Sequence, residues 1–98
     1  MVEEKTLPAE LAQLAERQTW FSRPNAERVL AWLESERLPL YGIEASRKQP
    51  DGNWMLLLDP MLSVGDDVEP AASIQQGRDF IAQHSDADLM FEPVWPGY

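Results

Sequence analysis

The chain contains no cysteine and only one histidine among its 98 residues. Without thiols it forms no disulfide, no zinc–thiolate site and no cysteine nucleophile. The single imidazole, His84, is the only one available to activate a hydroxyl such as that of Ser63. The sequence also has no phosphate-binding glycine loop, dinucleotide fingerprint or nucleophile elbow. We therefore expect a protein that is not an enzyme and has no catalytic residues, resident metal or cofactor.

Long apolar runs are missing as well. The longest run of aliphatic side chains, Met55 to Leu58, is far too short to cross a bilayer. The N-terminus begins Met-Val-Glu-Glu-Lys, which has two acids where a secretion signal needs a positive charge and then an apolar stretch. These features predict a protein that acts in the cytoplasm and does not bind the membrane.

Basic residues are scarce in one half of the chain. Residues 1–50 contain eight acids and seven bases, whereas residues 51–98 contain nine acids and one base, Arg78. The total charge is −9, and the acidic half repels phosphate, which argues against direct binding of nucleic acid. It would attract a basic protein partner instead. The alternative is that the charge serves only to keep a small protein soluble.

The sequence favours a single domain with two helices in its first part. Its length suits one domain, and an apolar content of 44% with four Trp and three Phe can supply one core. Residues 1–6 read as a frayed tail. Leucines at helical spacing predict a first helix near residues 8–18. A second helix begins near Pro24, capped by Ser22 or Asn25, and ends before Pro39.

Two strands joined by a tight turn are expected next. Leu40 to Lys48 alternates in the manner of a strand. Pro50-Asp51-Gly52 then supplies the proline and glycine of a turn. The returning strand, Trp54 to Leu58, is apolar on both faces, which predicts a central strand covered on both sides or a strand at an interface.

The last part of the chain predicts a third helix and a third strand. After a polar loop over residues 59–69, a helix runs from Pro70 to about His84, and Gly77 lets it approach the sheet closely. Leu89 to Phe91 forms a short strand. Residues 92–98 form a proline-rich tail, which we expect to stay outside the sheet. The fold class is α+β, in the order α-α-β-β-α-β, with about three partly antiparallel strands and three helices in one domain over residues 1–98.

Two acidic segments are candidate sites. His84, Asp86 and Asp88 form a His-x-Asp-x-Asp string that could ligate a divalent metal. The alternative is a histidine at a helix C-terminus followed by an acidic turn. The second segment, residues 66–69, has half the acids of a calcium loop but lacks its spacing. These acids suit the N-terminus of the third helix, or form a loop that faces a partner.

One third of the chain resembles a known family. A helix bearing Val29, Leu30 and Leu33 leads into the segment Leu38 to Ala45, and a polar hairpin and Trp54 follow. This pattern is similar to the small immunity proteins that protect bacteria from their own polymorphic toxins, and within them to the immunity protein 40 group. That group has a glycine pair and an acid in its strand, whereas here Gly42 stands alone and Glu44 lies one position further on.

The resemblance implies a non-enzymatic inhibitor that plugs the active site of a toxin, often a basic nuclease. It carries over no binding residues. From the residues themselves, we expect contacts from the acids of the second half and from Trp95, an aromatic in the proline-rich tail; the alternative for Trp95 is a tail folded back over the sheet. The candidate partner-binding residues are Asp59, Asp66, Asp67, Glu69, Asp86, Asp88, Glu92 and Trp95.

The leading hypothesis is therefore an acidic, immunity-type inhibitor of a basic protein. Three alternatives remain open at this point. The chain could mimic nucleic acid, or act as a phage-type inhibitor of a defence enzyme. It could be a small enzyme or metal binder built around His84. It could also be a structural subunit that forms a homodimer through the strand Trp54 to Leu58.

Overall fold

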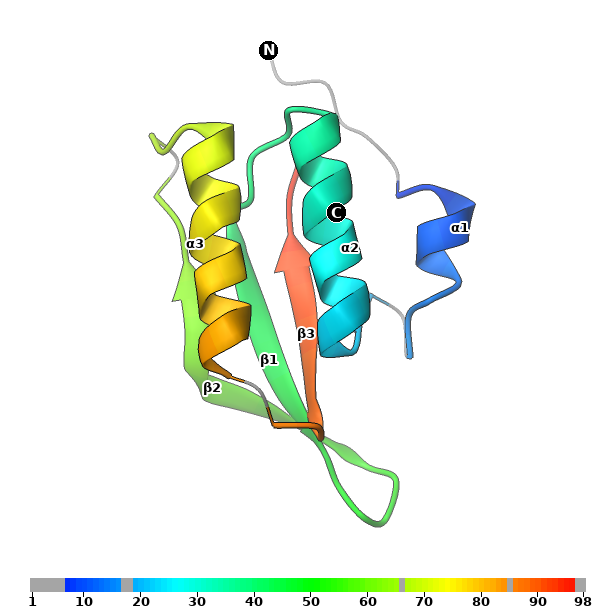
Figure 1. Cartoon of the computed structure of the whole chain (residues 1–98). Coiled ribbons are helices and arrows are strands. Elements are labelled where there is room, and N and C mark those ends of the chain that lie inside the picture. Colours follow the sequence, from blue (N-terminus) through cyan, green and yellow to red (C-terminus); the bar gives the residue numbers. More distant parts are fainter. Residues whose placement is uncertain (1–6, 17–18, 66, 85, 97–98) are drawn as a thin grey trace.

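The computed structural model describes residues 7–16, 19–65, 67–84 and 86–96, without the side chains of residues 58–60 (Figure 1). It confirms the α+β class and the order of the elements. These are α1 (Ala9–Ala12), α2 (Arg23–Ser35), β1 (Gly42–Lys48), β2 (Trp54–Ser63), α3 (Pro70–Gln83) and β3 (Leu89–Val94).

The described strands form one antiparallel sheet in the order β2-β1-β3, so β1 is the central strand. Figure 1 shows α2 and α3 side by side on the same face of this sheet. Beyond the outer edge of β3, Phe21 forms an isolated antiparallel bridge with Phe91. That bridge places the chain segment before α2 alongside β3.

The core lies between the two long helices and the sheet. Ile43 and Ala45 of β1 and Phe91 of β3 are buried on the face that the helices cover. The predicted close approach at Gly77 is confirmed, because a Cβ atom there would lie 2.5 Å from the Leu40 Cδ2 atom and 3.4 Å from the Ile43 Cδ1 atom. A glycine is therefore needed for α3 to pack this closely on the sheet.

One of the two predictions for the returning strand is wrong. Trp54 to Leu58 does not lie centrally, because β2 is an edge strand; the alternative, a strand at an interface, stays a prediction. Its apolar residues on both faces therefore reflect exposure rather than burial on two sides: Met55 and Leu56 are both exposed. The first helix is also shorter than expected, ending at Ala12 rather than residue 18. It buries none of its residues, and an isolated helix of this length has little to stabilise it.

Both flanking strands run further than the sequence predicted. β2 continues past Leu58 to Ser63 through a bulge, in which residues 58–61 of β2 stand opposite one residue of β1. Pro60 is tolerated there because it needs no ladder hydrogen bond on an edge strand. β3 continues to Val94, so the expectation that residues 92–98 stay outside the sheet is wrong for the first three. Pro93 fits because every second residue of β3 directs its N–H away from β1. The N–H of Phe91, two residues earlier, accordingly donates to the Phe21 carbonyl and not to β1.

A buried serine ties α3 to the segment that enters β1. The Leu40 N–H donates to the Ser73 Oγ atom at 2.9 Å, and this hydroxyl donates to the Pro70 carbonyl at 2.7 Å. Ser73 is fully buried, so water has no access to the Leu40 N–H. The interaction holds the start of β1 against the first turn of α3.

We predict that Ser73→Ala lowers the free energy of unfolding by about 1–3 kcal/mol, because it leaves the Leu40 N–H buried without an acceptor. Urea denaturation followed by circular dichroism measures the change. The matched control is Ser35→Ala, which removes an exposed hydroxyl that donates to the Trp32 carbonyl and should change stability by less than about 0.5 kcal/mol. Equal effects of the two substitutions would contradict the assignment.

Candidate functional site

The sheet has a second face that α2 and α3 do not cover, which we call the helix-free face. Because paired residues of antiparallel strands point to the same side, the register assigns its members. Ser46 follows the helix-facing Ala45 in β1, so its side chain points away from the helices. Its partners in the neighbouring strands, Leu56 and Met90, point to the same side. The described residues that define the face are Glu44, Ser46, Leu56, Met61, Met90, Glu92 and Val94.

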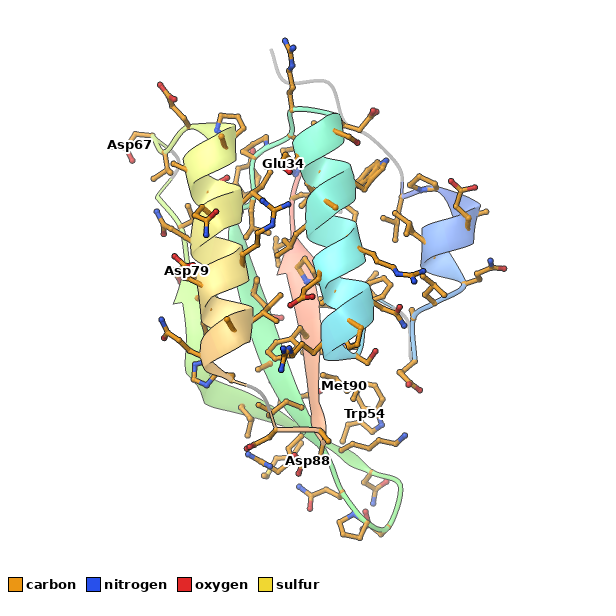
Figure 2. The ribbon with its side chains drawn as sticks, in the orientation of Figure 1. Glu34, Trp54, Asp67, Asp79, Asp88 and Met90 are labelled. Atoms are coloured by element: carbon orange, nitrogen blue, oxygen red, sulfur yellow. The ribbon has the colours of Figure 1, made fainter. Side chains whose placement is uncertain are left out.

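Two tryptophans cover one end of the helix-free face. Trp20 precedes the bridge at the β3 edge, and Trp54 begins β2 at the opposite edge. Their ring centroids lie 6.3 Å apart in an edge-to-face arrangement, a favourable geometry for aromatic pairs. Figure 2 shows Trp54 close to Met90 at this end of the sheet. Ser46 and Met90 are accordingly buried on a face that carries no helix.

The remainder of the face exposes large apolar side chains. On this face Leu56 is 56% exposed and Met61 is 48% exposed; Tyr41, which precedes β1 and lines the recess described below, is 42% exposed. Together with Met55 of β2, these are all the large apolar side chains that the described residues expose. They therefore gather on one edge strand and beside it, rather than being scattered over the surface as single exposed residues usually are.

Two carboxyl groups lie in the middle of this face. Glu44 of β1 is paired directly with Glu92 of β3, and Glu92 is only 6% exposed. Its carboxylate also accepts a hydrogen bond from the Thr19 hydroxyl. A hydrogen bond with Glu92 raises the pKa of Glu44 above its usual range, and burial and the charge of Glu92 raise it further. Like charges directly opposite each other destabilise a sheet, so this pair needs a proton or an external cation.

A recess of about 280 Å³ opens beside Glu44, where β2 bulges away from β1. Gly42 permits this geometry, because a Cβ atom there would lie 2.5 Å from the Leu62 carbonyl oxygen. Glu44 is the one charged residue among the described residues that line the recess. The lining residues are Tyr41, Gly42, Ile43, Glu44, Met61, Leu62, Ser63 and Val94.

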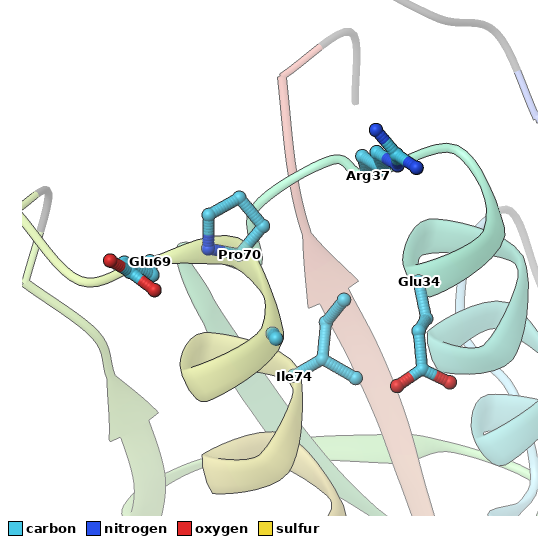
Figure 3. A pocket seen from close by; sticks show the side chains of 6 residues that line it. Glu34, Arg37, Glu69, Pro70 and Ile74 are labelled. Atoms are coloured by element: carbon cyan, nitrogen blue, oxygen red, sulfur yellow. The ribbon is translucent and has the colours of Figure 1, made fainter.

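A second hollow, of about 330 Å³, lies between the end of α2 and the start of α3. Figure 3 shows Ile74 between the two helices, with Glu34 on the α2 side and Glu69 on the loop before α3. Arg78 donates to both Glu34 oxygens, at 2.9 and 3.1 Å, and this pairing lowers the pKa of Glu34. The hollow has an apolar floor and rim charges of both signs, including Arg37, so it offers no convergent chemistry.

The residues of the histidine-containing string do not form a cluster. Asp88 and Asp86 both accept hydrogen bonds from Arg47, at 2.6 and 3.4 Å. The His84 ring packs on Phe80, with a centroid distance of 4.8 Å. Within the described ranges, no three His, Asp or Glu side chains are grouped so that they could hold a metal ion.

The predicted partner-binding residues do not form one surface. Figure 2 places Asp67 and Asp88 at opposite ends of the molecule, and Glu69 lies near Asp67 at the start of α3. Glu92 is buried, as is Trp95, whose ring packs on Trp32 at 6.0 Å. Trp95 therefore follows directly on β3 and packs against α2, rather than lying on the surface as an exposed anchor or folding back over the sheet. Asp66 and the side chain of Asp59 lie outside the described part of the chain.

Sequence reasoning missed Glu44 and the exposed residues beside it. Glu44 lies within the predicted strand Leu40 to Lys48, but its pairing with Glu92 depends on the register between β1 and β3, which are more than forty residues apart. The one available signal was the acid in the otherwise apolar segment Leu38 to Ala45.

Comparison of the chain with protein-family models, curated proteins and solved structures found no match. Of the helices that the structure describes, none has the length and apolar character needed to span a membrane.

We predict that Glu44→Gln stabilises the protein at neutral pH by roughly 0.2–1 kcal/mol, because it removes one of two opposed carboxylates. With its raised pKa, Glu44 keeps its proton in the folded chain at pH values where the unfolded chain, at about 4.5, has lost it. Wild-type stability therefore falls as the pH rises from about 4.5 through the raised pKa. At pH values below about 4.5 Glu44 is protonated and therefore neutral, as glutamine is, so the difference in stability between variant and wild type should become smaller there.

Urea denaturation between pH 4 and pH 8 tests this dependence. The matched control is Glu10→Gln, which alters an exposed acid of α1. A difference between Glu44→Gln and wild type that stays constant over the whole pH range would contradict the carboxyl pairing.

Proposed function

We propose that this chain is a non-enzymatic acidic protein that binds and neutralises a basic protein partner in the cytoplasm, in the manner of an immunity-type inhibitor. The observation that carries the proposal is the placement of the Glu44–Glu92 pair inside an exposed apolar patch on the helix-free face. A catalytic role has less support, because the described part of the chain offers no grouped metal ligands and His84 packs on Phe80.

The apolar side chains supply the attractive part of such an interface. Leu56, Met61 and Tyr41 lie on and beside one edge strand and are about half exposed. Interfaces typically have an apolar centre that excludes water, surrounded by a polar rim. Aromatic side chains and methionines are enriched in that centre, which suits the composition of this patch.

The charges favour a basic partner. The chain carries a net charge of −9, which accelerates encounters with a positively charged protein. At the face itself, the two opposed carboxyls cost stability in the free protein. A cationic group from a partner removes this repulsion, so the same feature that destabilises the free chain strengthens the complex.

A second copy of the chain is a poorer occupant. It brings the same net charge of −9 and the same carboxyl pair to the interface. Like charges brought together across an interface cost several kcal/mol. The homodimer therefore serves as a contrasting outcome of the test.

The experiment is affinity capture from host lysate with wild type and two variants at low and moderate salt, with bound proteins identified by mass spectrometry. We predict recovery of a basic protein whose binding to Leu56→Ser is weakened about tenfold, or ~1.4 kcal/mol. The matched control, Ala72→Ser, alters an exposed residue of α3 and should bind as wild type does. Moderate salt should weaken capture because it screens the charges.

Two results would contradict the proposal. One is a captured protein that binds Leu56→Ser and wild type equally well, because the helix-free face would then lie outside the interface. The other is self-association without any basic partner, detected by sedimentation of the purified chain at moderate salt. That result would favour the structural homodimer.

A further inference from the structure

The recess beside Glu44 has the composition of a site for one extended cationic side chain. Its described walls combine polar groups, such as Ser63, with apolar and aromatic side chains, such as Tyr41 and Met61, and its single charged group is Glu44. Its volume of about 280 Å³ is slightly below the range of pockets for drug-sized ligands. The recess therefore suits a side chain better than a whole cofactor.

We propose that this recess receives an arginine side chain of the partner, with its guanidinium on Glu44 and its aliphatic stem between Tyr41 and Met61. The inference rests on the proposed function, for which it names the recognition chemistry. It also identifies Glu44 as the residue that selects for the partner.

The neighbouring carboxyls favour a guanidinium over an ammonium. Glu44 and Glu92 lie directly opposite each other on adjacent strands, where Cβ atoms are about 5 Å apart. Guanidinium is planar and presents five donors in a fixed fork, so it can pair with the Glu44 carboxylate in a bidentate manner and leave donors for Ser63. It also stacks on aromatic rings such as that of Tyr41 more readily than a lysine does.

The described lining of the recess contains a further acceptor and no basic residue. Ser63 lines the recess, so its hydroxyl can accept a hydrogen bond from a donor held there. Arg47 of β1 pairs with Asp86 and Asp88, and no basic residue is among the described residues that line the recess. The described lining thus offers two acceptors, the Glu44 carboxyl and the Ser63 hydroxyl, and no basic side chain.

The test is a titration of the isotope-labelled chain with Nα-acetyl-arginine amide at fixed ionic strength, followed by amide chemical shifts. We expect saturable shifts at Gly42, Glu44 and Ser63, with dissociation in the millimolar range. The neutral isostere Nα-acetyl-citrulline amide should bind at least about tenfold more weakly, since it cannot form a charge-assisted pair. Nα-acetyl-lysine amide should also bind more weakly than the arginine probe.

The variant Glu44→Gln should weaken binding of the arginine probe at least about tenfold. Asp79→Asn, which alters an exposed acid of α3, removes one charge elsewhere and should leave binding unchanged. Equal binding of the arginine and citrulline probes, or unchanged binding to Glu44→Gln, would overturn the inference. Shifts spread over the whole acidic surface, lost equally in both variants, would also overturn it.

The two proposals fail in distinguishable ways. If a basic partner is captured through Leu56 but the arginine probe produces no saturable shifts, the proposed function stands and the arginine site is wrong. If the probe binds at Glu44 but no basic partner is captured, the recess is a guanidinium site and the proposed function is wrong.

Discussion

Close packing of α2 and α3 on one face of the central strand β1 governs the rest of the structure. Gly77 brings α3 within contact of Leu40 and Ile43, and Ser73 binds the Leu40 N–H in the same region. This arrangement buries Ile43, Ala45 and Phe91 completely, and burial of such apolar surface is the main stabilising contribution to the fold. Because α2 and α3 both pack on the same face of the sheet, the other face is not covered by either of them.

The helix-free face is consequently where polar and apolar groups conflict. Trp20 and Trp54 shield one end of it, while Leu56 and Met61 remain exposed and Glu44 lies opposite Glu92. Natural proteins most often break the rules of good packing at functional sites. An unfavourable carboxyl pair within an apolar patch becomes favourable when a cation covers it, and this reasoning links the fold to the proposed binding of a basic partner.

The candidate site was much harder to predict than the fold. The acids of residues 51–98 were recognised, yet Asp86 and Asp88 bind Arg47, and Glu92 and Trp95 are buried. Local composition indicates how many charges a chain carries, but the partners of each charge come from segments distant in the sequence. Glu44 and Glu92 meet only because β1 and β3 pair in one particular register.

The sequence by itself determined the local elements: the start of α2 near Pro24, the turn at Gly52, and the helix that begins at Pro70. Proline, glycine and apolar periodicity act over a few residues, so their effects can be read locally. Only the tertiary structure decided that β2 is an edge strand, that Pro93 lies within β3, and which acids face each other. Strand order and register depend on which buried faces fit together, and this long-range packing cannot be predicted from any short segment of the sequence.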